Sequence, residues 1–347
     1  VGEGEIEFQK IINNIEKDNF DKKIYHGTRM ENLDDIPFPS IDLLEPDITY
    51  YQGNLPRHKS PETVMLWSRG CPFNCFFCSD SVFGKTKPRF RSPENIVKEI
   101  SKLRDIGIKE IFVYDDDLIG VTQEQKEWLV RVCKLIIRNR LKMIFKCQGR
   151  CSRHVDLKTL KLMKKAGFRC IMWGCESGSD RVLKNLRKGT TVDDIRKSIR
   201  LCKEAGIEAW MFVMIGNHTE TVQDAKKTIK LVKKCRPDHI QVTYATPYPS
   251  DFEKLCLERN LIIESDRSKW DTNKPVIKPD SMTLADMVAY RERILAAYTK
   301  QRLLNPNIFL SSDNLILKKA GRFFYLCQHY GFGYALKKTK EKIARCF

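Results

Sequence analysis

The sequence has 347 residues, of which 42% are hydrophobic and 31% charged, and its formal net charge is +18 at pH 7. This length suits one large α/β domain with appended segments, and the composition is that of an ordinary globular protein. No window of eighteen apolar residues and no secretory signal is visible, which argues against a membrane span and against secretion. Thirteen cysteines at irregular spacings do not form a disulfide scaffold pattern and favour a reducing cytoplasm.

The positive charge would suit a polyanion or an anionic membrane face as partner. Lysines are scattered over most of the expected helices, however, and a solvated, lysine-rich surface is the commoner cause of such a charge. Nucleic acid is therefore a disfavoured partner that the composition leaves open.

The first sixty residues carry turn and linker signals. The chain opens with Val1-Gly-Glu-Gly-Glu5, which predicts a glycine turn followed by a helix. Residues 31–60 contain Pro37, Pro39 and Pro56, which exclude a helix and predict a linker. We place the main domain boundary near residue 60.

Strand and helix patterns alternate over residues 61–262. Gly107, Gly167 and Gly206 each follow an expected helix and precede an apolar run, which is typical of αβ turns. The expected strands are 63–69, 110–115, 142–148, 169–174, 208–215 and 239–245. The expected helices are 93–106, 122–140, 156–166, 192–205 and 218–235. Six such units with right-handed crossovers predict an α/β fold, a parallel sheet curled into a partial (βα)6 TIM-like barrel.

The first expected strand runs directly into Cys71-Pro-Phe-Asn-Cys75-Phe-Phe-Cys78. Three thiolates at this spacing, on a loop that leaves a strand, can bind one iron–sulfur cluster. Three protein ligands leave one iron of a cubane open, and an open position is what a catalytic metal centre needs. Two alternatives remain on spacing alone: a zinc knuckle that lacks its fourth ligand, and three unrelated buried cysteines.

This segment resembles the CxxxCxxC signature of the radical S-adenosylmethionine (radical SAM) superfamily, with the aromatic Phe77 before the last cysteine. The resemblance implies a [4Fe–4S] cluster on Cys71, Cys75 and Cys78, whose open iron binds the amino and carboxylate groups of SAM. It also implies reductive cleavage of SAM to a 5′-deoxyadenosyl radical, and a reductant such as flavodoxin or ferredoxin.

The next two strand ends extend the resemblance. Three carboxylates, Asp115-Asp-Asp117, follow the second strand, and in the family this position contacts the SAM amino group. Asp116 and Asp117 are therefore the candidates, with helix N-capping as the alternative role. Arg150 follows the third strand, where the resemblance implies that it binds the SAM carboxylate bidentately. Cys147 and Cys151, four residues apart, are interpreted as ordinary packing rather than as a second metal site.

The fourth strand ends in Trp173-Gly-Cys-Glu176-Ser177-Gly, which resembles the family's Gly-x-Glu-Ser-Gly segment and implies that Glu176 and Ser177 lie beside SAM. The segment Lys188-Gly-Thr-Thr191 is also a family feature, and Thr191 is expected to cap the next helix.

The fifth strand ends in Gly216-Asn-His-Thr-Glu220-Thr, which is similar to the family's Gly-x-Pro-Gly-Glu-Thr turn. Gly216 and Glu220 are the cofactor-binding candidates here. Asn217 and His218 depart from the family pattern, and His218 is interpreted as a side chain at a helix start. The sixth strand ends in Thr246-Pro-Tyr-Pro249, which is expected to line the floor of the cavity.

The likeness is greatest to the subgroup whose fuller members join a cobalamin-binding domain to this core. Those members carry out methylation of unactivated carbon or anaerobic oxidative cyclisation of porphyrins. In that subgroup a Gly-Glu-Gly-Glu turn closes the cobalamin domain, so residues 1–30 would be its end or a remnant of it. The sequence contains no Asp-x-His-x-x-Gly motif, so cobalamin is implied by the subgroup and not by a ligand of this chain.

Residues 263–347 are expected to form a mainly helical extension, with one helix over 280–301. The segment from Leu315 to Phe347 is basic and aromatic. Peripheral contact with an anionic membrane is one interpretation, and a cationic helix that closes the barrel is the favoured one.

These observations predict a radical SAM enzyme that methylates, cyclises or rearranges a small-molecule or lipid-like substrate. A radical SAM enzyme that modifies tRNA is the alternative within enzymes. A zinc-stabilised binding module without catalytic activity is the alternative from another class.

Overall fold

The computed structural model describes residues 2–17, 24–43, 58–79, 87–119 and 122–303. Its centre is a six-stranded sheet in the order β1-β4-β5-β6-β7-β8, in which every neighbouring pair is parallel. The strands are Glu62–Met65 (β1), Glu110–Val113 (β4), Ile144–Arg150 (β5), Phe168–Glu176 (β6), Glu208–Ile215 (β7) and His239–Tyr244 (β8). Neighbours in space are thus neighbours in sequence, as successive βα units require. The partial (βα)6 barrel predicted from the sequence is confirmed.

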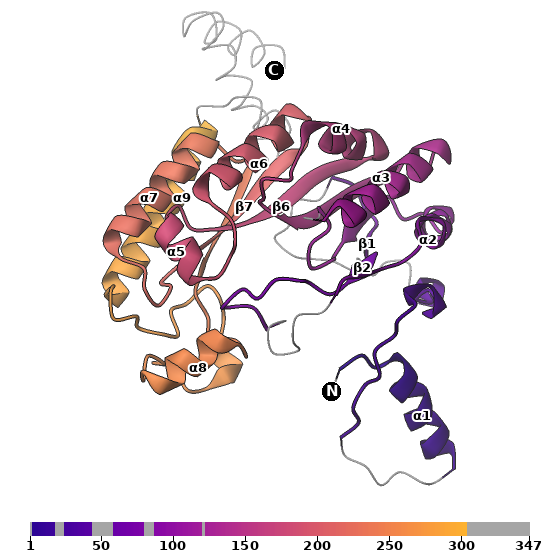
Figure 1. Ribbon diagram of the computed structural model, residues 1–347, viewed down its shortest axis with the longest axis horizontal. Helices are drawn as coiled ribbons and strands as arrows, with labels where there is room; N and C mark the ends of the chain where they lie inside the picture. Colours follow the sequence, from indigo (N-terminus) through magenta and orange to yellow (C-terminus); the bar gives the residue numbers. More distant parts are fainter. Residues whose placement is uncertain (1, 18–23, 44–57, 80–86, 120–121, 304–347) are drawn as a thin grey trace, which may run out of the picture.

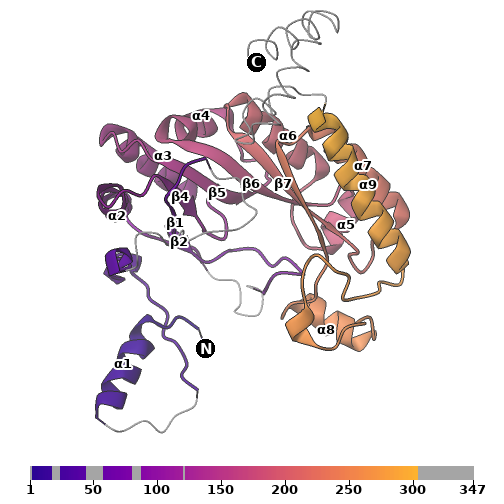
Figure 2. The same cartoon turned by 180° about the vertical axis from the view of Figure 1, so that it is seen from behind.

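Long helices cover one face of this sheet (Figures 1 and 2). They are α2 (Pro93–Asp105), α3 (Gln123–Arg138), α4 (Leu157–Ala166), α6 (Val192–Glu204), α7 (Val222–Cys235) and α9 (Leu284–Leu303). Local chemistry sets their ends, since the expected cap Thr191 forms a capping box with Asp194, and Thr221 forms one with Asp224. Gly167 ends α4 with φ 119°, and a Cβ there would lie 2.2 Å from the Met143 carbonyl oxygen.

Three local features differ from the sequence-based expectation. The first strand stops at Met65, and the chain then forms β2 (Ser68–Arg69), which pairs with β3 (Arg89–Phe90) in a separate two-stranded sheet. The chain leaves the first strand here because the buried Asp115 carboxylate accepts hydrogen bonds from the Trp67 N–H at 2.7 Å and from the Ser68 hydroxyl at 2.6 Å. Two short helices, α5 (Asp180–Asn185) and α8 (Asp251–Glu258), were not expected. Two 3-10 turns, Leu33–Asp35 and Ile41–Leu43, interrupt the expected linker.

The N-terminal segment is attached to the barrel by charge. Helix α1 (Glu5–Glu16) stands apart from the sheet and has no buried residue (Figure 1). Glu3 pairs with Arg89 and lies 3.6 Å from Arg69, and Glu5 also pairs with Arg69. The hydrogen bond from Arg89 lowers the pKa of Glu3 to about 2. The Gly-Glu-Gly-Glu segment therefore docks on β2 and β3 through its two glutamates.

A network of buried ions joins the amino ends of the strands. Lys146 on β5 is fully buried, and its Nζ lies 2.6 Å from Glu62 Oε1 and 3.5 Å from Glu110 Oε1. The His58 ring lies 3.4 Å from Glu110 and 3.3 Å from Glu208 on β7. Glu110 lies on β4, and β5 and β6 separate β4 from β7 in the sheet, so His58 links two strands that are not neighbours.

The histidine at the centre of this network has an unusual pKa. Hydrogen bonds to Glu110 and Glu208 raise the pKa of His58 to about 9. Burial opposes ionisation of Glu208, but hydrogen bonds from His239 and His58 outweigh it and lower the pKa of Glu208 to about 2. Both groups are therefore charged at neutral pH.

The structure also bears on two expectations, one about a membrane span and one about the C-terminal extension. Within the described ranges, no helix is both long enough and apolar enough to cross a bilayer. The helix expected over 280–301 is present as α9, which packs against α7 and β8. The basic segment from Leu315 to Phe347 lies outside the described residues.

We predict that the His58 network makes stability fall as the pH rises. A histidine pKa raised above its unfolded value gives stability that is complete below about pH 6.5 and is lost as the pH passes through the folded value. Chemical denaturation should therefore show His58→Gln to be less stable than wild type by about 1–2 kcal/mol at pH 6.5, with the gap closing by pH 10. The exposed His154→Gln is the control and should follow wild type. A gap that is independent of pH would contradict the assignment.

Candidate functional site

The cysteine loop is held at the carboxyl ends of the strands by backbone hydrogen bonds. The Gly70 N–H donates to Asp116 Oδ2 at 3.0 Å, which fixes the start of the loop to the end of β4. In its middle, the Phe76 N–H donates to the Leu186 carbonyl at 2.9 Å and the Phe76 carbonyl accepts from the Phe252 N–H at 3.0 Å. The end of α5 and the start of α8, the two helices missed from the sequence, thus clamp the centre of the cysteine motif.

The three thiols of the loop differ in exposure. Cys75 is buried, whereas Cys71 and Cys78 are partly exposed. Burial raises the pKa of the Cys71 thiol to about 12, and the Asp117 carboxylate adds to the rise, so ligation of a metal must displace its proton. No three His, Cys, Asp or Glu side chains in the described part of the chain converge on a single ion. A cubane binds its thiolates on different irons, and three cysteines of one loop can supply them.

Arg150 lies beside the buried thiol at the end of β5. Its Nη1 lies 3.3 Å from Cys75 Sγ, and its guanidinium carbon lies 3.7 Å from the centre of the Phe73 ring. Its backbone N–H donates to Asp117 Oδ1 at 3.1 Å. The Nη2 atom is buried and has no hydrogen-bond partner among the described residues. A buried guanidinium edge of this kind calls for an anion, and a carboxylate matches its geometry.

The three consecutive aspartates have separate positions. Asp115 is fully buried on the Trp67–Ser68 turn, and burial raises its pKa to about 7. Asp116 contacts the backbone of the cysteine loop through Gly70, and Asp117 contacts the backbone of Arg150. None of the three caps α3, because the Thr122 side chain does so. The capping role considered from the sequence is therefore wrong for Asp116 and Asp117.

A buried ion pair lies near Cys75. The Lys188 ammonium is 2.8 Å from Glu176 Oε1 and 5.5 Å from the centre of the Phe77 ring. Burial lowers the pKa of Lys188, but the charges of Glu176 and Cys75 outweigh it and leave the pKa raised. Glu176 has φ 58° at a register shift of β6, and a Cβ on Gly174 would lie 2.8 Å from Lys188 Nζ. The backbone of β6 is thus shaped around this pair.

Gly216 and Glu220 form the turn after β7. Gly216 has φ 85°, and Glu220 Oε2 accepts from the Gly216 N–H at 2.8 Å and from the Asn217 N–H at 3.3 Å. Complete burial raises the pKa of Glu220 to about 7. The ring of His218 packs against those of Phe76 and Phe252, with centroids 5.0 and 5.9 Å away, and so contacts the cysteine loop.

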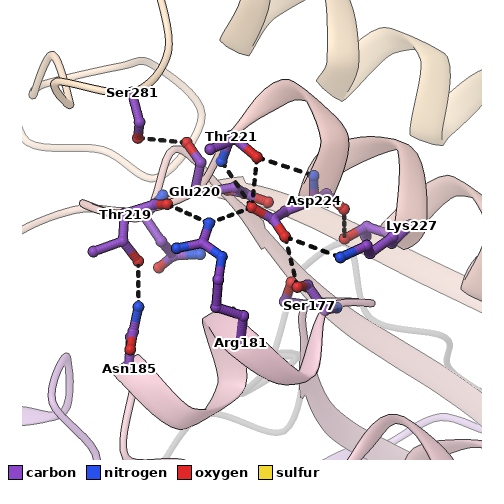
Figure 3. Close-up of polar contacts among 12 residues, drawn as sticks. Ser177, Arg181, Asn185, Thr219, Glu220, Thr221, Asp224, Lys227 and Ser281 are labelled. Carbon is purple, nitrogen blue, oxygen red and sulfur yellow. Dashed lines mark hydrogen bonds and ion pairs between the residues drawn. The ribbon is translucent and has the colours of Figure 1, made fainter.

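Figure 3 shows a second polar cluster next to this turn, between α5 and α7. Asp224 accepts a hydrogen bond from the Ser179 hydroxyl at 2.6 Å and pairs with Arg181. Ser177 lies at this end of β6, fully buried, and its hydroxyl accepts from the Ser179 N–H at 3.2 Å. These polar contacts fix the turn after β6 to the turn after β7.

The candidates therefore fall into two groups. One group consists of the cysteine loop and the strand ends beside it, and contains Cys71, Cys75, Phe77, Cys78, Asp116, Asp117, Arg150 and Glu176. The other contains Ser177, Gly216 and Glu220 and makes the neighbouring turns. Sequence reasoning missed the role of Lys188 and Phe73, although both lie inside motifs that it quoted. Cys147 and Cys151 do not pair with each other; Cys151 Sγ lies 3.8 Å from Cys175 Sγ in the core.

Comparison with known proteins shows which family the chain belongs to. Residues 65–232 match the family model of the radical SAM superfamily. The uncharacterized methyltransferase PH0819 of Pyrococcus horikoshii is 31% identical over 339 residues, which cover 92% of this chain and 71% of the relative. The anaerobic magnesium-protoporphyrin IX monomethyl ester cyclase of Rubrivivax gelatinosus is 26% identical over 273 residues, 76% of this chain and 47% of the relative.

A solved structure shares the fold. The radical S-adenosylmethionine methyltransferase TsrM from Kitasatospora setae, with cobalamin and a [4Fe–4S] cluster bound, aligns with a TM-score of 0.53 at 17% identity. The alignment covers 80% of this chain and 61% of TsrM, so the chain spans less than two thirds of that protein. The zinc-stabilised module considered from the sequence gives way to an enzyme. The chain belongs to the radical SAM superfamily, whose members use a [4Fe–4S] cluster and SAM, and its relatives include methyltransferases and a cyclase.

Proposed function

We propose that this enzyme cleaves SAM reductively at a [4Fe–4S] cluster held by Cys71, Cys75 and Cys78, and that it methylates or cyclises a small-molecule or lipid-like substrate. The observation that carries the proposal is the Arg150 guanidinium, which lies 3.3 Å from Cys75 Sγ and has a buried Nη2 without a partner among the described residues. An amino-acid carboxylate bound to the open iron would lie against that edge. When bound, the cluster supplies the electron that breaks the sulfonium bond.

The side chains around Cys75 then have distinct roles. Arg150, stacked on Phe73, would bind the carboxylate of SAM and fix its orientation. Asp116 would hold the start of the cysteine loop, and Asp117 would hold the backbone of Arg150. Both would have the SAM amino group as their ligand. Glu176, held by Lys188, would accept hydrogen bonds from the ribose hydroxyls.

A second set of groups would shape the site without binding the carboxylate. The positive charge of Lys188 would stabilise the negative charge that cluster and thiolates carry. Phe76 and Phe77 would exclude water from the radical. Ser177, Gly216 and Glu220 would fix the turns against which the adenosine lies.

We infer the domain arrangement expected from the sequence: a unit at 1–30, a linker at 31–60, the core at 61–262 and an extension at 263–347. The apolar face of α1 supports the first unit, because Phe8, Ile12 and Ile15 are 64%, 40% and 52% exposed. A cobalamin-binding domain is the partner that the resemblance implies for this face. The irregular spacing of the thirteen cysteines supports a reducing, cytoplasmic setting.

The first prediction concerns the cluster. Anaerobically reconstituted wild-type protein, given SAM and dithionite, should form 5′-deoxyadenosine, and Cys75→Ala should form none and lose most of its iron. Products are measured by mass spectrometry and iron by colorimetry. Cys133→Ala, in the buried face of α3, is the control and should keep both. A Cys75→Ala variant that still cleaves SAM would disprove the assignment.

The second prediction concerns Arg150. Arg150→Lys keeps the charge and loses the planar fork, so the Kd for SAM should rise about tenfold. Equilibrium binding to the reconstituted, oxidised protein measures it without turnover. The exposed Arg153→Lys is the matched control. Equal affinity in the two variants would show that Arg150 does not contact SAM.

The third prediction concerns Lys188. Lys188→Met leaves the Glu176 carboxylate buried without its counter-charge, so the unfolding midpoint should fall and SAM cleavage should slow about 10- to 100-fold. The double variant Lys188→Met with Glu176→Gln removes the buried charge and should recover stability but not rate. The exposed Lys184→Met on α5 should match wild type. Recovery of the rate in the double variant would mean that Lys188 is only structural.

A further inference from the structure

An open groove with a volume of about 1020 Å³ runs between α3 and α4. It follows both helices from their first turns, at Gln123 and Leu157, to Lys134 and Lys165. These helices lie side by side on the outer face of the sheet (Figure 1). Two acidic side chains line the groove, Glu127 and Asp156. Its basic lining residues are Lys126, Arg131, Lys134, Lys158, Lys161 and Lys165.

Most of this positive charge has no counter-charge. Lys126 pairs with Asp156 at 2.5 Å, and Arg131 lies 3.9 Å from Glu94. Within the described ranges, the four exposed lysines Lys134, Lys158, Lys161 and Lys165 form no ion pair. Like charges that line one groove raise its potential and attract an acidic surface.

The apolar residues of the groove favour an acidic protein over a nucleic acid as its partner. Val130, Leu157 and Leu162 line it, and no aromatic side chain does. Sites for single-stranded nucleic acid stack bases on aromatic side chains, which this groove lacks. A small apolar patch inside a charged rim is instead the pattern of a transient protein interface.

The start of the groove is connected to the cysteine loop. In the first turn of α3, the Gln125 amide donates to the Asp117 carbonyl at 2.5 Å. Asp117 Oδ1 accepts from the Arg150 N–H at 3.1 Å, and Arg150 Nη1 lies 3.3 Å from Cys75 Sγ. The first turn of α3, whose Gln123 lines the groove, is therefore linked through the buried Gln125 to the residues around Cys75.

We propose that the α3–α4 groove binds the acidic one-electron carrier protein that reduces the cluster. The inference rests on the proposed function and adds the place and charge of the reductant's contact. The carrier loses one electron and the cluster gains it. That electron is consumed when the C5′–S bond of SAM breaks, which yields methionine and the 5′-deoxyadenosyl radical without transfer of a proton.

The test compares two reductants on two charge-reversed variants. The groove variant carries Lys134→Glu, Lys161→Glu and Lys165→Glu. The control carries Lys226→Glu, Lys230→Glu and Lys234→Glu, three exposed lysines of α7, and has the same net charge. The reductants are dithionite and an acidic two-cluster ferredoxin that has been reduced and freed of its reductant.

The groove variant should cleave SAM with ferredoxin at least about tenfold more slowly than wild type and depend less on salt, because charge pairs steer the encounter. Its dithionite rate should stay within about twofold of wild type, and the α7 control should keep both rates. Equal losses in the two variants, or an unchanged ferredoxin rate in the groove variant, would overturn the proposal. Loss of bulk tRNA binding with an unchanged ferredoxin rate would assign the groove to nucleic acid.

A binding measurement separates this inference from the proposed function. Calorimetric titration of oxidised ferredoxin into each protein reports docking without SAM cleavage. Binding that the groove variant loses and the α7 control retains supports the docking site. Failure of wild-type protein to cleave SAM with dithionite, while it still binds ferredoxin through the groove, would refute the proposed chemistry alone. Absence of ferredoxin binding in wild type would refute the docking site.

Discussion

The carboxylates that follow β4 set the geometry on which the site depends. Asp115 holds the Trp67–Ser68 turn, Asp116 holds the first residue of the cysteine loop, and Asp117 holds the backbone of Arg150. Asp115 and Asp117 are buried, and buried carboxylates are tolerated only when hydrogen bonds satisfy them; Asp116 is exposed. The donors to the three come from two other strand ends. One tripeptide thus fixes the distance between the thiols and the guanidinium that approaches them.

Groups with different roles lie at the two ends of the strands. Ion pairs around Lys146 and His58 lie toward the amino ends, next to an apolar cluster that contains Phe112, Met172 and Trp210. Cys75, Arg150 and the Glu176–Lys188 pair lie at the carboxyl ends. In barrels of this kind, groups at the carboxyl ends carry reactions and those at the amino ends carry stability. The loops above can therefore vary in sequence without disturbing the ions that hold the strands together.

Most of the fold follows from local patterns in the sequence, and part of the site does not. Strand runs, helix caps and stop glycines act over a few residues, so the six βα units could be predicted. The short α5 and α8 are too brief for a periodic signal, and their role in clamping Phe76 depends on tertiary contacts. Lys188 acquires its position only because folding brings it to Glu176 and Cys75. Capping, the alternative role considered for Asp116 and Asp117, is wrong because Thr122, further along the chain, caps α3.

The attachment of α1 gives the N-terminal segment a particular mechanical character. Its contacts with β2 and β3 are ion pairs to Arg69 and Arg89, and no residue of the helix is buried. Such a joint gives up little apolar burial when it opens, and salt screens its partly exposed ion pairs more than it screens the buried pairs of the barrel. Arg69 precedes the cysteine loop by a single residue, so the Glu5–Arg69 pair places α1 beside the start of that loop. Ionic strength therefore acts on a contact that joins α1 to the segment leading into the cysteines.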